Sequence, residues 1–336
     1  MTVRLAVLGA GRWGKTLIRA FSSLPQVSVG LVVDPTAEAR RWAADFNLPT
    51  AAEARAALDD PSFDAVAIAA PAALHAELTI RALHAGKHVF VEKPLCLSTA
   101  EGSRLRRAAE AAERVVMVGH LMLYHPAVEG LLQLVREGEL GAVRYLHASR
   151  LNCGTVRVHE NAWWSLAPHD LSMIISLLGE LPTRVSARGV ALSRSNIEDV
   201  VFAHLDFPGG VQASLHVSWL EPEKRRQLTV VGERRTALFD DVAVVEKLRV
   251  VDVGAHLRRA ERTPTELLEA APNTRFGSRG RSVEPLQAEL AHFIAAVLEG
   301  SKPRTGIDEG LKVVRVLEAG QRSLEAGGRA VPVEPA

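Results

Sequence analysis

The feature that most constrains this chain is a glycine-rich turn near its beginning, Gly9-Ala10-Gly11-Arg12-Trp13-Gly14, which fits the pattern GxGxxG. The apolar run of residues 3–8 precedes the turn directly, and a helix-length amphipathic stretch, 14–24, follows it. A turn of this kind between a strand and a helix lets backbone N–H groups approach a pyrophosphate at the helix N-terminus. A glycine turn that binds nothing is the alternative, and this placement disfavours it.

The alternation of short apolar runs and amphipathic stretches continues to about residue 121. The runs that we expect to be strands are 3–8, 27–34, 65–70, 88–92 and 115–121. The stretches that we expect to be helices are 14–24, 36–47, 75–85 and 99–113. Apolar strands that alternate with helices are typical of a parallel sheet covered on both faces. The first part of the chain is therefore predicted to be a doubly wound α/β domain.

The pattern changes after Pro126, where strands follow one another with few helices between them. The expected strands are 143–151, 184–190, 200–206, 211–219, 226–231 and 236–239, and the expected helices are 127–137, 168–178, 284–299 and 308–325. Polar and apolar residues alternate strictly along 211–219, as in an antiparallel strand with one polar face. We predict two domains, 1–121 and 122–336, the second an α+β domain with a large, open, mostly antiparallel sheet. Residues 262–285 show little periodicity and are expected to form a long loop.

Composition excludes several classes of protein. The 336 residues carry 40 Lys and Arg against 39 Asp and Glu, a net charge of +1, so we expect neither nucleic acid nor a membrane as partner. The two cysteines lack CxxC spacing, and the histidines show no HExxH-like spacing, so neither a disulfide scaffold nor a metal site is expected. The sequence contains no apolar run of about 18 residues, and its first apolar run is short, so we expect neither a membrane span nor a secretory leader and predict a cytoplasmic protein.

Two further strand ends carry polar groups that suit a dinucleotide. Asp34 closes the second predicted strand, where a carboxylate accepts hydrogen bonds from a ribose 2′-hydroxyl and repels a 2′-phosphate. NAD is therefore expected over NADP, although Arg40 and Arg41 lie nearby in sequence. Ala70-Pro71 ends the next strand with His75 close behind, and His75 on its own could equally be a helix-surface residue.

Two segments contain groups suited to acid–base chemistry. Glu92-Lys93-Pro94 ends the fourth predicted strand, and ligands of open α/β sheets bind at such ends. A lysine there can hold a substrate hydroxyl or move its proton, whereas the plain alternative is an exposed lysine before a proline. His169 lies near the start of the helix expected from 168, where a neutral imidazole could accept a proton from an alcohol. The alternative for His169 is a capping pair with Asp170.

Taken together, these motifs make the chain similar to the glucose–fructose oxidoreductase / inositol dehydrogenase (Gfo/Idh/MocA) family. The resemblance rests on the GAGRWG turn, Glu92-Lys93-Pro94, the strand end Val118-Gly119-His120, Gly138-x-Leu140-Gly141 and the segment Glu284-Pro285-Leu286. It implies a Rossmann domain for NAD(P), dimerisation through the C-terminal sheet, and oxidation or reduction of a sugar or polyol carbon. It also implies that Lys93 and His169 are catalytic. The aspartates that many members carry four residues before and three after this histidine are here Ser165 and Ser172, which leaves the proton route open.

A closer resemblance, to UDP-N-acetylglucosaminuronic acid 3-dehydrogenases, is carried by Arg150-Leu-Asn152 and by Asn161-x-x-Trp164-x-Leu-Ala-Pro-His-Asp. The possible substrate residues are Tyr124, Arg150, Asn152, Asn161, Trp164 and Asp170. Guanidinium groups suit carboxylate and phosphate, so Arg150, Arg275, Arg279 and Arg281 suggest an anionic substrate. A solvated loop or subunit contact explains the last three equally well, and the aromatic residues could simply be core.

The sequence therefore predicts an NAD-dependent enzyme that transfers hydride at a carbinol carbon of a sugar, a nucleotide sugar, a uronic acid or a polyol. The expected cofactor-binding residues are Gly9, Ala10, Gly11, Arg12, Trp13, Gly14, Asp34, Ala70, Pro71, His75, Glu92, Lys93 and Pro94. Two alternatives stay open: an NAD-assisted, redox-neutral glycosidase and a non-catalytic NAD-sensing protein. A homodimer or homotetramer that pairs through the polar face of the C-terminal sheet is also expected.

Overall fold

A computed structural model describes residues 2–154, 156–252, 273–275 and 284–334 of the chain. The chain divides into two compact units, one of Met1–Tyr124 with Val283–Val314 and the other of His125–Ser282 with Arg315–Ala336. The expected boundary at 121/122 thus differs from the observed one by three residues at that point. Residues 283–314 return to the first unit, which the sequence division placed in the second domain.

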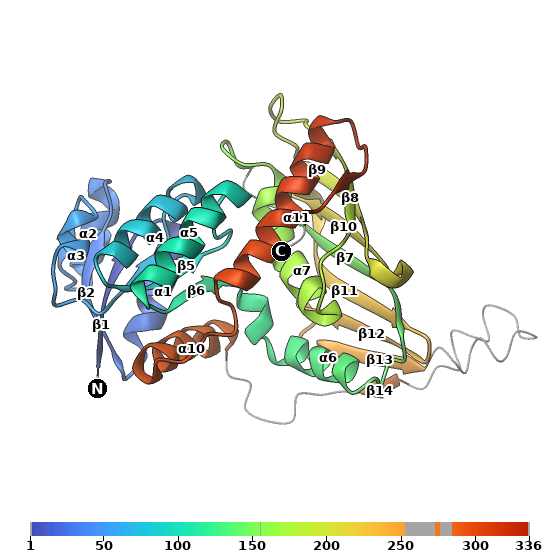
Figure 1. Cartoon of the computed structure of the whole chain (residues 1–336), viewed down its shortest axis with the longest axis horizontal. Helices are drawn as coiled ribbons and strands as arrows, with labels where there is room; N and C mark the ends of the chain where they lie inside the picture. The colour runs from blue at the N-terminus through green and yellow to red at the C-terminus, as the bar shows by residue number, and fades with distance from the viewer. Residues whose placement is uncertain (1, 155, 253–272, 276–283, 335–336) are drawn as a thin grey trace, which may run out of the picture. The chain divides into compact units, whose positions relative to one another are not determined.

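The first unit is built on a six-stranded parallel sheet with strand order β3-β2-β1-β4-β5-β6 (Figure 1). Its strands are β1 (Val3–Leu8), β2 (Val27–Val33), β3 (Thr50–Ala51), β4 (Ala65–Ile68), β5 (His88–Glu92) and β6 (Val116–Gly119). Its helices are α1 (Arg12–Ser22), α2 (Ala37–Asp45), α3 (Arg55–Leu58), η1 (Ala72–Leu74), α4 (His75–His84), α5 (Thr99–Ala112), η2 (Leu121–Tyr124), α10 (Pro285–Glu299) and the first turns of α11 (Ile307–Glu325). The predicted doubly wound α/β architecture is confirmed.

Apolar side chains on both faces of this sheet explain why strands β1, β4, β5 and β6 are almost wholly buried. On one face, Phe90 of β5 packs edge-on against Phe21 of α1 and Phe293 of α10, with ring centroids 5.9 and 5.7 Å away. On the other face, strand residues such as Val91 pack with Leu105 of α5 in one apolar cluster. The strand order reverses between β1 and β4, so the chain leaves the sheet in opposite directions there. In open α/β sheets, ligands bind outside the carboxyl ends of the strands at such a point.

The second unit contains a nine-stranded sheet with strand order β14-β13-β12-β11-β7-β10-β9-β8-β15. Its strands are β7 (Val143–Cys153), β8 (Arg184–Val190), β9 (Val200–Asp206), β10 (Gln212–Ser218), β11 (Leu220–Gly232), β12 (Arg235–Asp240), β13 (Leu248–Asp252), β14 (Asn273–Arg275) and β15 (Val331–Pro332). The remaining elements are α6 (Pro126–Arg136), α7 (Ala162–Leu178), η3 (Pro208–Gly210) and the later part of α11. All strand pairs are antiparallel except β7 with β10, which confirms the predicted mostly antiparallel sheet.

One face of this sheet is covered by α6 and α7, as Figure 1 shows. The hairpin expected around Pro208 joins β9 to β10, with Asp206 opposite Gln212. Strand β11 begins six residues earlier than the expected 226–231 and bulges between Leu220 and Arg225, where its pairing with β7 shifts register. Of the expected loop 262–285, residues 273–275 form a strand beside β13, and 253–272 and 276–283 lie outside the described residues.

The observed start of helix α7 differs from the predicted one, and the difference changes the position of His169 within the helix. The sequence analysis placed its start at about Pro168. The helix instead begins at Ala162, and Asn161 caps it by accepting a hydrogen bond from the backbone N–H of Trp164 at 3.1 Å. Pro168 lies inside the helix, and His169 is two turns from the N-terminus. The effect of the helix dipole is confined to the first turn, so it does not act on His169 as expected.

Candidate active site

The glycine turn between β1 and α1 has the geometry that a dinucleotide requires. Gly9 has a φ of +102°, and a Cβ built on it would lie 2.6 Å from the carbonyl oxygen of Ala69. A Cβ on Gly14 would lie 2.1 Å from the Gly9 oxygen, whereas a Cβ on Gly11 would meet nothing within 4 Å. Gly9 and Gly14 are thus needed to close the turn against strand and helix, and Gly11 leaves open space beside the backbone. The residues fit a pyrophosphate held by main-chain N–H groups.

Asp34 lies against this turn at the end of β2. Its carboxylate accepts hydrogen bonds from the Ala10 N–H (2.8 Å) and from the N–H and hydroxyl of Thr36 (2.8 and 2.7 Å). Burial by itself would raise the pKa of Asp34, but these hydrogen bonds, with the Arg40 guanidinium nearby, hold that pKa below its ordinary value. The carboxylate is therefore ionised and anchored beside the turn, as a ribose-binding residue must be. Arg40 donates instead to the carbonyls of Asp34 and Pro35, at 2.8 Å each.

His75 joins the ends of two neighbouring strands. Its Nε2 lies 2.9 Å from the carbonyl oxygen of Ala70, after β4, and its Nδ1 lies 2.7 Å from that of Pro94, after β5. The side chain is 1% exposed, so His75 is an interior residue and not a helix-surface one. The structure thereby brings together Ala70, Pro71, His75 and Pro94, all of which the sequence assigned to the cofactor region. The contacts fix the position of the loop that contains Lys93.

Lys93 follows β5 directly, at the carboxyl edge of the parallel sheet, and its side chain is partly exposed. The preceding residue, Glu92, is buried, and one of its oxygens accepts a hydrogen bond from the indole N–H of Trp13. Its other oxygen accepts from the Lys93 backbone N–H at 3.3 Å. Burial raises the pKa of Glu92 above its ordinary value, and the Trp13 hydrogen bond and the Lys93 charge only partly oppose this rise. The glycine turn and Lys93 are thus linked through Glu92.

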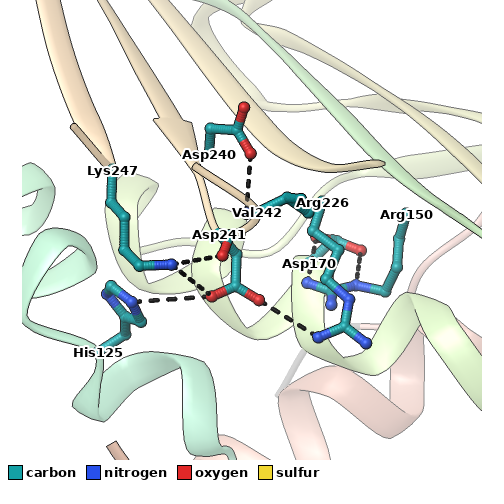
Figure 2. Close-up of polar contacts among 8 residues, drawn as sticks. All are labelled: His125, Arg150, Asp170, Arg226, Asp240, Asp241, Val242 and Lys247. Atoms are coloured by element: carbon teal, nitrogen blue, oxygen red, sulfur yellow. Dashed lines mark hydrogen bonds and ion pairs between the residues drawn. The ribbon is translucent and has the colours of Figure 1, made fainter. Parts of the chain in front are cut away.

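In the second unit, His169 is partly exposed on α7, and the neighbouring Asp170 is buried. Asp170 accepts two hydrogen bonds from Arg150 of β7, from Nε at 2.7 Å and from Nη2 at 3.0 Å (Figure 2). Both side chains are at most 5% exposed. Asp170 is therefore the partner of Arg150 and not a cap for His169. The Arg150 guanidinium, which the sequence analysis considered as a contact for an anionic substrate, is hydrogen-bonded to Asp170.

Several other residues that were predicted as possible substrate contacts form hydrogen bonds within the protein. Asn161 caps α7, and its amide donates to Glu198 (2.7 Å) and Gln321 (3.0 Å). The Trp164 indole also donates to Gln321, at 3.2 Å. In the first unit, the buried hydroxyl of Tyr124 lies 3.3 Å from that of Thr305. Asn152 is partly exposed on β7. Arg275 lies in β14, and Arg279 and Arg281 lie outside the described residues.

Sequence reasoning missed two buried ionisable residues of the first unit that interact with the segment Glu92-Lys93. His120, just after β6, is 1% exposed, and burial together with the Lys93 charge lowers its pKa to about 4. Glu289 of α10 is also 1% exposed, and burial together with the charge of Glu92 raises its pKa well above the ordinary value. The sequence analysis named His120 only in the strand end Val118-Gly119-His120 and among the histidines without metal-ligand spacing, and gave it no role in the site. Glu289 gives no signal in the sequence, because its neighbour Glu92 belongs to a distant segment.

No three His, Cys, Asp or Glu side chains of the described residues gather as a metal ion would require. No helix in that part of the chain has both the length and the apolar character needed to cross a membrane.

The fold and the turn define the class of protein: a two-unit oxidoreductase with a Rossmann unit for a dinucleotide. Residues 3–120 match the oxidoreductase family with an NAD-binding Rossmann fold, and residues 128–238 match the GFO/IDH/MocA C-terminal domain. The chain belongs to the Gfo/Idh/MocA family and is an NAD-binding oxidoreductase. The resemblance seen in the sequence is confirmed.

Individual relatives agree with this assignment. The chain is 30% identical over 282 residues to an uncharacterized oxidoreductase of Rhizobium meliloti, with 80% of each chain covered. It is 29% identical over 239 residues to UDP-N-acetylglucosamine 3-dehydrogenase of Acidithiobacillus ferrooxidans, with 71% of this chain and 74% of the relative covered. The structure of that enzyme covers 98% of this chain and 100% of its own at a TM-score of 0.83. Levoglucosan dehydrogenase in complex with NADH and levoglucosan shares the fold at 20% identity, with a TM-score of 0.86 and 100% of both chains covered.

Proposed function

We propose that this chain transfers hydride between a carbinol carbon of a sugar or polyol and NAD, with Lys93 and His169 as the catalytic residues. The observation that carries the proposal is the place of Lys93 directly after β5, at the same sheet edge as the glycine turn and Asp34. Groups at this edge face the ligand in open α/β folds. The names of the relatives, which include a nucleotide-sugar dehydrogenase, support a sugar as the substrate.

Each catalytic role follows from the chemistry of the residue and its own surroundings. NAD supplies the hydride acceptor. The Lys93 ammonium donates a hydrogen bond to the substrate hydroxyl and stabilises the negative charge that develops on its oxygen. His169, partly exposed on α7, accepts the hydroxyl proton as a general base and returns it when the reaction runs backwards. Ser165 and Ser172, which stand where many members have aspartates, carry hydroxyl groups, so neither supplies a carboxylate to His169.

The proposal is tested by replacing each residue separately with alanine. Lys93→Ala and His169→Ala are expected to bind NAD with near-normal affinity, while turnover falls roughly 100-fold or more, the usual size of a lost acid–base contribution. Lys224→Ala, in the exposed start of β11, is a matched control for the loss of a lysine. Full turnover in both variants would refute the assignment.

A substrate screen tests the substrate class. We propose a nucleotide sugar or its uronic acid first, and the probes are UDP-N-acetylglucosamine, UDP-N-acetylglucosaminuronic acid, neutral sugars and inositols. Each is mixed with the protein and either NAD or NADP, and NADH or NADPH absorbance is followed. A rise with NAD alone supports both the dehydrogenase and the role of Asp34. Substrate consumption without net NADH would instead indicate a redox-neutral reaction, and no consumption of any probe would favour a sensing role.

We further propose that the chain forms a homodimer or homotetramer in the cytoplasm through the face of the nine-stranded sheet opposite α6 and α7. Aromatic side chains lie exposed there: Tyr145 of β7 is 51% exposed and Phe202 of β9 is 49% exposed. Phe202 stacks on His216 of β10 with ring centroids 4.2 Å apart. Exposed apolar groups of this kind are common at subunit interfaces. Phe202→Glu should lower the mass measured by light scattering, and an unchanged mass would count against this interface.

A further inference from the structure

The second unit contains an arginine that the proposed reaction does not use. Arg226 of β11 lies opposite Arg150 of β7 in the pairing of the two strands, so both side chains project from the same face of the sheet. This is the face covered by α7, because Arg150 donates to Asp170 of that helix. Arg150 is buried, whereas 40% of the Arg226 side chain is exposed. Of the two guanidinium groups, Arg226 is therefore the one that a ligand from solvent reaches more easily.

The carboxylates beside the two arginines are used differently (Figure 2). Asp170 forms a one-to-one pair with Arg150 through two hydrogen bonds. Asp241 is shared: one of its oxygens lies 3.3 Å from Nη1 of Arg226, and the other lies 3.6 Å from Nζ of Lys247. A single negative charge thus lies between two permanent positive charges. It neutralises one of them, so Arg226 and Lys247 together keep one positive charge that Asp241 does not balance.

Two other ionisable groups near Asp241 leave this imbalance in place. Nε2 of His125, which caps α6, lies 3.8 Å from an oxygen of Asp241. Burial lowers the pKa of His125 below its ordinary value although the charge of Asp241 opposes this effect, so the imidazole is uncharged at neutral pH. Asp240 accepts a hydrogen bond from Gln227 at 2.9 Å. Because Gln227 follows Arg226 along the strand and is paired with Asp240, the Asp240 carboxylate belongs to the opposite face of the sheet.

Most hydrogen-bond donors of Arg226 are not used by its neighbours. Within the described part of the chain, its guanidinium donates one hydrogen bond, from Nη1 to Asp241. A guanidinium has five N–H donors in a planar fork, which matches a carboxylate or a phosphate through two parallel hydrogen bonds. The backbone N–H of Asp241 donates to the Arg226 carbonyl oxygen at 2.9 Å, which fixes the two residues relative to each other. Nε and Nη2 of a positioned, partly exposed arginine therefore remain for a ligand.

We propose that Arg226 binds an anionic group of the substrate, a carboxylate or a phosphate, and that the substrate is therefore an anionic sugar. Lys247 strengthens the attraction, because the bound anion balances the remaining positive charge of the two side chains. Asp170, the partner of the neighbouring Arg150, directly follows His169 in α7, so the anion site and the proposed base belong to the same part of the second unit. The inference rests on the proposed function for the identity of the ligand as the substrate.

The first test detects anion binding at Arg226 directly, in the full chain and without turnover. Phenylglyoxal modifies arginine side chains, and peptide mass spectrometry gives the rate for each arginine in the presence of glucuronate, inorganic pyrophosphate or neutral N-acetylglucosamine. At about ten times its Kd, an anion that binds Arg226 should slow the modification of this residue roughly tenfold, because only the free guanidinium reacts. Arg225, the exposed neighbour that projects from the opposite face, is the matched control and should be unaffected.

The two anions distinguish the possible sources of the negative charge. Protection by glucuronate indicates a carboxylate, as in a uronic acid, whereas protection by pyrophosphate indicates the phosphates of a nucleotide sugar. Either result supports the proposal, and neutral N-acetylglucosamine should not protect. Failure of both anions to protect Arg226, or equal protection of Arg225, would overturn it.

Kinetics with a substrate found in the screen give the second test. Arg226→Met should raise KM for an anionic substrate about tenfold or more and change kcat much less, because a charge-assisted hydrogen bond to the bound substrate is lost. Arg226→Lys keeps the charge without the fork, so its KM should fall between those of wild type and Arg226→Met. Arg225→Met should leave KM within about twofold of wild type. An equal rise of KM for anionic and neutral substrates would show a merely structural role for Arg226 and refute the proposal.

The variants and the labelling also separate this inference from the proposed function. In Arg226→Met, Asp241 keeps Lys247 and His125 as partners, so the variant should remain folded, which thermal unfolding verifies. If an anion protects Arg226 while no probe of the screen reduces NAD, the anion site stands and the proposed hydride transfer fails. If neutral sugars reduce NAD and no anion protects Arg226, the proposed function stands and this inference fails.

Discussion

The indole N–H of Trp13, in the first turn of α1, donates a hydrogen bond to the buried carboxylate of Glu92. Trp13 belongs to the glycine turn, and Glu92 precedes Lys93 in the chain. One hydrogen bond therefore ties the expected pyrophosphate site to the expected catalytic lysine. It also supplies one of the few groups that stabilise a negative charge on Glu92.

Replacing Trp13 tests how much that hydrogen bond contributes. Trp13→Phe keeps an aromatic ring, which is 41% exposed in the native residue, but removes the donor. Hydrogen bonds to charged groups contribute about 1.5–3 kcal/mol, so the free energy of unfolding should fall by about that amount at pH 7. Urea denaturation measures the change, with Trp42→Phe as the aromatic control. Equal stability of Trp13→Phe and wild type would mean that Glu92 does not depend on this donor.

Gly14 and Gly11 of the turn should separate stability from cofactor binding. In Gly14→Ala the new Cβ would lie 2.1 Å from the Gly9 oxygen, a backbone atom that cannot move freely, so we expect a loss of about 2 kcal/mol or more. In Gly11→Ala the Cβ meets nothing within 4 Å, and stability should change by less than about 0.5 kcal/mol. The same Cβ occupies the space beside the backbone where the pyrophosphate is expected, so NAD affinity should fall roughly tenfold or more. Thermal unfolding and NAD titration of both variants check this contrast, which normal NAD binding by Gly11→Ala would contradict.

Asp34 should determine both cofactor choice and stability in acid. Asp34→Ser removes the carboxylate, so NAD affinity should fall about tenfold or more while discrimination against NADP decreases. Because the folded protein lowers the pKa of Asp34, the ionised carboxylate stabilises the fold above the ordinary value of 3.8. This stabilisation is lost as the pH falls below that value, through the folded pKa. Unfolding of wild type and variant from pH 6 to pH 2 should show the difference between them shrinking in acid. A difference that does not depend on pH would rule out this role for ionisation.

Glu289 should have the opposite pH dependence. Its pKa is raised in the folded protein, so above the ordinary value of 4.5 the unfolded chain loses this proton while the folded chain keeps it. Wild-type stability therefore falls by about 1.4 kcal/mol per pH unit from this group until the folded pKa is reached. Glu289→Gln removes the loss, so its stability relative to wild type should increase as the pH rises above 4.5. Thermal unfolding at a series of pH values above 4.5 decides the point, and a stability difference that does not grow with pH would contradict it.

Most helices and strands, the glycine turn and the position of Asp34 could be predicted from local sequence patterns. Each of these features depends mainly on residues that are neighbours along the chain. The start of helix α7 was predicted six residues too late, because Asn161 caps the helix and is itself held by Glu198 and Gln321 from other segments. Glu289 could not be foreseen for the same reason. In a one-dimensional pattern it is an ordinary polar residue on an amphipathic helix, and only the fold places it inside, beside Glu92. Interactions between distant segments thus decide which polar residues are functional candidates.

Arg150 and Asp170 form a buried ion pair, and Arg150 could in addition bind an anionic substrate. Variants of the pair distinguish a purely structural role of Arg150 from a role in substrate binding. Removing one partner leaves an unpaired buried charge, so Arg150→Met or Asp170→Asn should each destabilise the protein by about 3–5 kcal/mol. The double variant Arg150→Met/Asp170→Leu leaves no charge behind, and most of the loss should be recovered.

Kinetics of this double variant settle the question. If the guanidinium serves only Asp170, as the two hydrogen bonds of 2.7 and 3.0 Å indicate, KM for the sugar substrate should stay within about twofold of wild type. If Arg150 also binds an anionic group of the substrate, KM should rise tenfold or more while the protein remains folded, because a charge-assisted hydrogen bond to substrate is lost. The comparison with a neutral substrate completes the test, because only an anionic one can depend on the guanidinium charge.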